Sequence, residues 1–355
     1  MVRTAMKRAH QLWGWAAVPA VLMVLALTLS LLGRVGGPLD RASDPQVSVS
    51  DGGSAQAPGL AEPTEPAPPF SVVDRTPLTL PEEVRFGTGV FALEGGRVYV
   101  VRFDLTTVKP ESEPGIGMYL NVSFSCQEHG GRGVGSIGGT ENLVPGDPVT
   151  YANQLLLRPA RDGVYRCGVL ASAPNDKVAA KGATVQLDSQ WRVSEVDGAA
   201  VQADTARTLP QTLDSDATAS PLQEQVPIDG AAHLETMFTM HVTTCTGVNG
   251  SREDGRAWCS GPVIDERGNS MAVQVRTELL DENGTACAVL EETTQQVTID
   301  KWVHHDLVPL HARLDLPAAP CGTTARTTVS IHNFGPAAVV LHESNTSLIV
   351  TTSTH

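Results

Sequence analysis

Histidines gather in the C-terminal part of the chain, where imidazole nitrogens could bind a transition-metal ion. Seven of the ten histidines lie within residues 233–342. On an extended strand His305 and His311 share one face, because side chains alternate between the two faces. Copper or zinc would need a third ligand, such as His332 or His342, brought close by the fold. We therefore treat His305 and His311 as weak metal candidates, with polar side chains on a strand surface as the alternative.

Six cysteines, all after residue 34, could form disulfide bonds in an oxidising compartment. Cys126 and Cys167 each fall on the apolar phase of an alternating segment, which predicts a buried bridge between two strands. Zinc binding would call for closely spaced cysteine pairs of the CxxC kind, and the sequence has none. The predicted pairs are Cys126–Cys167, Cys245–Cys259 and Cys287–Cys321.

Motifs for nucleophilic or metal-dependent catalysis, such as G-x-S-x-G, S-x-x-K and H-E-x-x-H, do not occur in the sequence. Residues 133–138 match G-x-G-x-x-G, but a dinucleotide site needs this turn between a strand and a helix. The residues that follow are typical of a loop, so we interpret the glycines as part of a flexible loop. We therefore predict no catalytic residue and no cofactor, and favour a protein that is not an enzyme.

Apolar and polar residues alternate with period two in several segments, including 99–105, 118–126 and 238–242, which indicates strands with one buried face. Turn-forming clusters separate these segments. The pattern predicts an all-β chain with two tandem, disulfide-stapled β-sandwich domains of the immunoglobulin-like type. We place the domains at residues 81–197 and 227–355, joined by a polar linker at 198–226. The order of cysteines and strands is similar in the two halves, which indicates a weak internal repeat.

Residues 12–33 form a 22-residue apolar run without a charged side chain, long enough to span a bilayer as a helix. Three basic residues precede the run and one follows it, which predicts a cytoplasmic tail at residues 1–11. Residues 34–80 are rich in proline, glycine and serine and should form a disordered stalk. The alternative is a cleaved signal peptide, and in both cases the rest of the chain is exported.

The chain carries a formal net charge of −14, and its only strongly basic part is the N-terminus. Such an acidic body repels phosphate backbones, so we predict no nucleic-acid partner. Arginine greatly outnumbers lysine, which fits a GC-rich bacterial genome. The sequence therefore favours a single-pass cell-membrane protein whose extracytoplasmic domains act as a non-catalytic binding or assembly module of a bacterial envelope. Its partners would be the membrane, through the N-terminal helix, and an envelope protein or glycan.

Two other functions stay open at this stage. One is an exported hydrolase that acts on wall polymer or glycan, which would need two facing acids or a Ser/His pair in a cleft. The other is a metal-handling envelope protein that uses the histidine-rich second domain. Neither has a sequence motif of its own.

Overall fold

The computed structural model describes residues 68–79, 82–108, 119–131, 133–143, 146, 148–173, 184–244, 268–299 and 305–355. These residues form an all-β structure of four sheets with one short 3-10 helix. The predicted tail, membrane helix and most of the stalk, together with Cys245 and Cys259, lie outside the described residues. Within the described part of the chain, no helix has the length and apolar character needed to cross a membrane.

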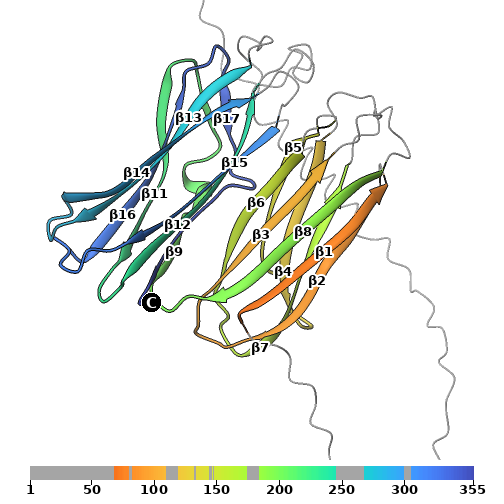
Figure 1. Cartoon of the computed structure of the whole chain (residues 1–355), viewed down its shortest axis with the longest axis horizontal. Helices are drawn as coiled ribbons and strands as arrows, with labels where there is room; N and C mark the ends of the chain where they lie inside the picture. Colours follow the sequence, from red (N-terminus) through yellow and green to blue (C-terminus); the bar gives the residue numbers. More distant parts are fainter. Residues whose placement is uncertain are drawn as a thin grey trace, which may run out of the picture. The chain divides into compact units, whose positions relative to one another are not determined.

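The first eight strands make two four-stranded antiparallel sheets (Figure 1). Sheet I has the order β1-β8-β3-β6, and sheet II has the order β2-β7-β4-β5. The strands are β1 (Phe70–Thr79), β2 (Glu83–Leu93), β3 (Tyr99–Val108), β4 (Tyr119–Glu128), β5 (Gly133–Asn142), β6 (Pro148–Leu157), β7 (Gly163–Ser172) and β8 (Thr184–Glu195).

The remaining ten strands make two further antiparallel sheets (Figure 1). Sheet III has the order β10-β17-β12-β18-β9, with β15 also paired to β12, and sheet IV has the order β11-β16-β13-β14. The elements are β9 (Ala200–Gln202), η1 (Thr205–Arg207), β10 (Gln211–Leu213), β11 (Ala217–Pro227), β12 (His233–Thr244), β13 (Asn269–Leu280), β14 (Ala286–Ile299), β15 (His305–Asp315), β16 (Thr324–Asn333), β17 (Val339–Leu341) and β18 (Ser347–Ser353).

The two halves repeat one strand order. If nine is added to each strand number of sheet II, the result is the strand order of sheet IV. The same addition to the strand numbers of sheet I gives β10-β17-β12-β15, which is the order of four neighbouring strands in sheet III. The long pairing of β1 with β8 corresponds to two short pairings, β10 with β17 and β9 with β18, because β17 and β18 both pair with β12. A shared order this specific supports the internal repeat that the sequence indicated.

Each pair of sheets encloses one hydrophobic core. The core of sheets I and II is built from the inward phase of each strand, as Val101, Phe103 and Leu105 of β3 illustrate. Trp191 is its largest fully buried side chain and packs against Phe91 and Phe124, with its Nε1–H donating to the Gly87 carbonyl at 2.7 Å. Sheets III and IV share a second core of mostly aliphatic residues. Alternating burial therefore produces two separate cores.

Disulfide bonds join two of the three predicted pairs, and these two bonds differ in exposure. Cys126 and Cys167 stand directly opposite each other on β4 and β7, and both are buried in the first core. Cys287 on β14 is bonded to Cys321, which precedes β16, and both residues are exposed. We call these the buried disulfide and the exposed disulfide. Both confirm the sequence prediction.

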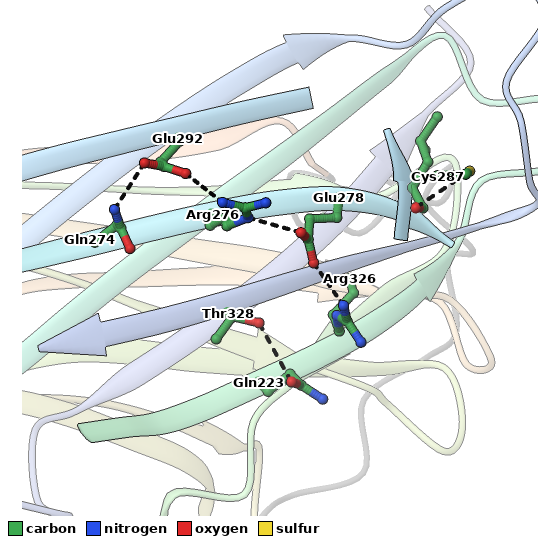
Figure 2. A network of polar contacts seen from close by, with 9 residues as sticks. Gln223, Gln274, Arg276, Glu278, Cys287, Glu292, Arg326 and Thr328 are labelled. Atoms are coloured by element: carbon green, nitrogen blue, oxygen red, sulfur yellow. Dashed lines mark hydrogen bonds and ion pairs between the residues drawn. The ribbon is translucent and has the colours of Figure 1, made fainter. Parts of the chain in front are cut away.

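Charged and polar side chains form a ladder on the outer face of sheet IV (Figure 2). The two carboxylate oxygens of Glu278 bind different arginines, Arg276 at 2.8 Å and Arg326 at 2.7 Å. Arg276 also binds Glu292 at 2.7 Å, and Glu292 accepts a hydrogen bond from Gln274. Hydrogen bonds from Arg326 and Arg276 hold the pKa of Glu278 below its ordinary value. The ladder ties β13, β14 and β16 together and is fully paired, so it is a stabilising feature.

Two predicted boundaries need correction. The stalk was predicted to reach residue 80, but its last ten-residue stretch before Leu80 is strand β1, paired with β8 along its whole length. Residues 198–226 were predicted to be a linker, yet they contain β9, η1, β10 and most of β11. In both places prolines and polar residues suggested a loop, but they lie at sheet edges, where proline and exposed polar side chains are tolerated.

The glycines at 133–138 belong to strand β5, so the predicted loop is also corrected. A side chain at Gly138 would collide with the Val122 carbonyl oxygen of the neighbouring strand, and one at Gly135 would press on Leu155. The glycines therefore permit close approach of neighbouring chain segments, which is a packing role.

Candidate functional site

The two pairs of sheets meet through side chains that point away from their cores. On β3 and β6 the outward residues include Val100, Arg102 and Gln154, and on β12 they include Glu235 and Met237. Val100, Met237 and Ile349 form a small apolar cluster of their own. The junction therefore brings together residues more than a hundred positions apart in the sequence.

Hydrogen bonds fix this junction at its centre. Gln154 Nε2 donates to Ser347 Oγ at 2.6 Å, and Ser347 Oγ donates to Asn153 Oδ1 at 2.7 Å. Asn153 Nδ2 donates to the Asn345 carbonyl at 2.9 Å, and Thr239 Oγ1 donates to the Ala152 carbonyl at 2.8 Å. Most of these groups are buried, so their pairing removes the desolvation cost that they would otherwise carry.

Leu307 of β15 locks the junction by entering the core of sheets I and II, where it is 5 % exposed. The space for its side chain exists because residue 139 is glycine. A Cβ at Gly139 would overlap Leu307 Cδ1 and Tyr151 Cδ1. The knob of one half thus fills a hole in the other, as tightly packed interiors require.

An ion cluster crosses the junction beside this lock. Glu235 Oε1 binds both the guanidinium of Arg102 and Nε2 of His311, the latter at 2.6 Å. Burial alone would raise the pKa of Glu235, but the hydrogen bonds from Arg102 and His311 outweigh it, and the pKa is lowered. Glu235 therefore remains a carboxylate and holds Arg102 in place.

Two adjoining hollows open on either side of this ion cluster. One has a volume of about 470 Å³ and is lined by residues of β3, β6, β8, β12 and β15. The other, of about 360 Å³, extends toward β18 and includes His233 and Arg313. Arg102 and Arg192 line both hollows. Together the hollows form an open groove, which we call the junction groove.

The junction groove contains an unusual pair of like charges. Arg102 on β3 stands directly opposite Arg192 on β8, and side chains opposed in this way repel each other. Asp104, two residues after Arg102, lines the larger hollow with a solvent-accessible side chain that is only partly desolvated. Burial raises the pKa of Asp104, and the guanidinium groups of Arg192 and Arg102 offset part of that rise. The groove thus presents fixed charges of both signs.

A second polar cluster lies at the other end of the β12–β15 pairing. His241 Nε2 and His305 Nδ1 are 3.0 Å apart, and the ring of His241 also stacks on that of His342 with centroids 4.5 Å apart. Thr243 Oγ1 and His342 Nε2 are hydrogen-bonded at 2.8 Å. The His305 backbone N–H donates to Asn142 Oδ1 at 2.7 Å. The imidazoles therefore connect β15 with β12 and with His342, while the His305 backbone attaches β15 to β5.

Two carboxyl groups meet close to these imidazoles. Glu141 on β5 is 7 % exposed and accepts a hydrogen bond from the Leu307 N–H at 3.2 Å. Burial raises the pKa of Glu141 well above its ordinary value, and the neighbouring Asp306 carboxylate raises it further. Burial also raises the pKa of Asp306 to about 6. Neighbouring buried carboxyls of this kind resist ionising together.

The structure separates the two weak metal candidates. His311 binds Glu235 in the ion cluster. His305 lies six residues before His311 on β15 and contacts His241 of β12 instead. Among the described residues, no group of three His, Cys, Asp or Glu side chains is arranged to hold a metal ion. His332 on β16 packs against Phe334, which follows that strand, and His342 stacks on His241. The third-ligand sets considered from the sequence are therefore not assembled in the described structure.

Sequence reasoning missed the junction groove altogether. Arg102 and Asp104 appeared only as polar members of an alternating segment, and such side chains are normally solvated, whereas Glu235 was not singled out at all. No local signal marks which outward faces will be covered, because that depends on how the two halves meet. Other strands also carry arginines, such as Arg85 and Arg276, so Arg102 does not stand out in the sequence.

No protein-family model and no curated protein matches this sequence. Three solved structures illustrate what it is similar to in space. The match to a peptide-N(4)-(N-acetyl-β-D-glucosaminyl) asparagine amidase covers 81 % of this chain and 97 % of the amidase chain, with 8 % sequence identity and a TM-score of 0.34. The match to the CBM22-1-CBM22-2 tandem domain from Paenibacillus barcinonensis covers 83 % of this chain and 100 % of the tandem domain, with 10 % sequence identity and a TM-score of 0.24. The match to the structure of the infectious bursal disease virus Gx strain covers 79 % of this chain and 71 % of the viral chain, with 11 % sequence identity and a TM-score of 0.28. Similarities at this level carry no argument about function.

Proposed function

We propose that this chain is a membrane-anchored, extracytoplasmic binding or assembly module of a bacterial cell envelope, and that it does not itself catalyse a reaction. Its binding surface is the junction groove. The observation that carries the proposal is an open, charged groove built by both halves and fixed beside a packed junction. Ligand sites occur preferentially at such junctions.

The fold suits a displayed module. We propose that sheets I and II form one β-sandwich of the immunoglobulin-like type and sheets III and IV a second, with boundaries near Glu195 and Ala200. The shared strand order and the two separate cores support this division. The Leu307 lock would make the two sandwiches move as one body and keep the groove in shape.

The proposed location rests on three features. Two disulfide bonds favour an oxidising compartment outside the cytoplasm. The apolar run at residues 12–33 has the length of a bilayer span, and the excess of basic residues before it favours an N-terminus on the cytoplasmic side. Residues 34–69 would hold the folded part away from the lipid surface.

Two measurements on the full-length protein in its native membrane test this function. First, protease added outside intact spheroplasts should digest the chain, and an alkaline wash should leave it in the membrane fraction. Protection from the protease, or release by the wash, would contradict the proposed anchoring. Second, mild-detergent purification after crosslinking should recover a stoichiometric envelope component. Recovery of a monomer with no bound protein or glycan would contradict the binding or assembly role.

A further inference from the structure

Strand β14 leaves an open edge on sheet IV. It is the longest described strand and stands last in the order β11-β16-β13-β14, so within the described part of the chain it is hydrogen-bonded to β13 alone. Residues 293–298, with the sequence TTQQVT, contain no charged residue, proline or glycine. Both irregularities of the β13–β14 pairing lie opposite residues 286–291, so the register of residues 293–298 is continuous. Such an edge presents backbone N–H and C=O groups to which another strand can pair.

The other edge strands of the described structure are protected against such pairing. Strands β9 and β10 have only three residues each, and prolines interrupt β1 at Pro77, β11 at Pro221 and β15 at Pro309. Strand β2 has a register shift between Phe86 and Gly89, and β5 and β6 are covered at the junction. Short length, proline, bulges and covering elements are the usual means of protecting an edge. Residues 293–298 of β14 have none of them among the described residues.

The sequence of this open edge is complementary to itself. Two copies of an edge strand related by a two-fold axis normal to the sheet pair antiparallel, and opposed residues then point to the same face. With the axis at Thr294, this residue faces its own copy, and Thr293 faces Gln295. In the same register Glu292 faces Gln296, so carboxylates do not oppose each other and each one meets an amide that can donate to it.

Glu292 has the capacity to accept this additional hydrogen bond. Its Oε1 accepts from Gln274 at 3.1 Å, its Oε2 binds Arg276 at 2.7 Å, and its side chain is still 43 % exposed (Figure 2). A carboxylate has about four acceptor positions, so an amide from a second copy can be added. A shift of the axis by one residue in either direction would place a threonine opposite Glu292, and the register centred on Thr294 is therefore favoured.

We propose that a second copy of this chain docks on β14, so that two four-stranded sheets IV become one continuous antiparallel sheet of eight strands. The polar ladder would then run across both copies. The interface is isologous and closes at two copies, because the same edge is used by each. This inference goes beyond the proposed function and does not depend on it, since the junction groove is lined by other strands.

Sedimentation equilibrium of the full-length protein in mild detergent tests this inference, and the parent protein should form a dimer. Thr294→Lys places two ammonium groups opposite each other at the axis, as natural edge strands use lysine to prevent pairing, and should raise the Kd of the dimer by about 10-fold or more. Gln223→Lys is the matched control. It adds the same charge at an exposed position on β11, the opposite edge of sheet IV, and should leave the Kd unchanged.

Engineered cysteines test the register itself. Thr294→Cys should form a disulfide between copies under mild oxidation, as the directly opposed Cys126 and Cys167 do between β4 and β7. Gln296→Cys should not, because Gln296 faces Glu292.

Four results would overturn the inference. A monomer at every concentration would reject the interface. A dimer that Thr294→Lys leaves intact would place association elsewhere, such as in the apolar run at residues 12–33. Equal weakening by Gln223→Lys would show a general effect of charge. A dimer that bonds through Gln296→Cys and not through Thr294→Cys would reject the proposed pairing.

Discussion

Replacing Asp306 with asparagine should stabilise the protein at neutral pH. Asp306 lies at the junction beside Glu141, and burial raises the pKa of Asp306 to about 6 from an ordinary value of 3.8. Asparagine has nearly the same shape, keeps an oxygen that can accept the Leu307 N–H, and carries no charge. The substitution therefore removes a costly ionisation without creating a cavity.

The size and sign of this effect follow from the two pKa values. A raised pKa means that the neutral carboxyl contributes stability, which is fully present below pH 3.8 and is lost as pH rises through about 6. At about 1.4 kcal/mol for each tenfold change in ionisation, the loss at pH 7.5 is about 3 kcal/mol. Asp306→Asn should recover up to this amount at pH 7.5 and almost none at pH 3.5. For a protein of this size, that corresponds to a rise in Tm of roughly 6 °C.

Thermal unfolding of both proteins at pH 3.5, 5, 6 and 7.5 measures the difference directly. Asp229→Asn, in an exposed turn, is the matched control and should follow the parent protein at every pH. The reasoning is refuted if Asp306→Asn gives no stabilisation at pH 7.5, or gives the same offset at all four pH values. A difference in Tm that does not depend on pH would reflect packing alone and would show that the pKa of Asp306 is not raised to about 6.

Three further predictions concern the junction, the disulfides and the polar ladder. Gly139→Ala should destabilise the protein by about 1–3 kcal/mol, because the new methyl group overpacks the Leu307 lock; unchanged urea unfolding would contradict the lock. Mild reductant under native conditions should open the exposed disulfide before the buried disulfide, because a reducing thiolate must reach the sulfur atoms. Mass spectrometry of alkylated peptides would show the order in which the two bonds open. Simultaneous loss of both bonds would contradict this prediction. Glu278→Gln should cost about 1.5–3 kcal/mol at pH 7, since it weakens two charge-assisted pairs. The pKa of Glu278 is lowered, so its contribution is lost as pH falls through that pKa, and a deficit that persists in acid would argue against this cause.

Local alternation was enough to predict several of the strands, such as β3, β4 and β12, and the buried disulfide between β4 and β7. Val101, Phe103 and Leu105 all lie in the first core, and the apolar phase of Cys126 and Cys167 placed both sulfurs there. These predictions succeeded because burial with period two is a property of each strand by itself. The same reasoning failed at β1 and at β9 to β11, where edge pairing depends on distant partners such as β8 and β17.

The candidate site could not be predicted in this way. Arg102 and Glu235 are separated by more than a hundred residues, and their contact exists only because two outward faces meet. His305 and His311 share a phase on β15, as expected, but six residues of extended chain carry them to opposite ends of the junction. Phase assigns a side chain to a face, whereas a site also requires proximity along the strand and across the junction.

A photo-crosslinking residue at position 194 of the full-length protein in its native membrane tests the central claim most directly. Ser194 lines the smaller hollow but has no part in the ion cluster, so its replacement should leave the groove intact. The same probe at Val73, which is 75 % exposed on edge strand β1, is the control. If the junction groove is the binding surface of an exported module, irradiation should attach a discrete envelope component at position 194 and none at position 73. No product at position 194, or the same product at both positions, would contradict the account.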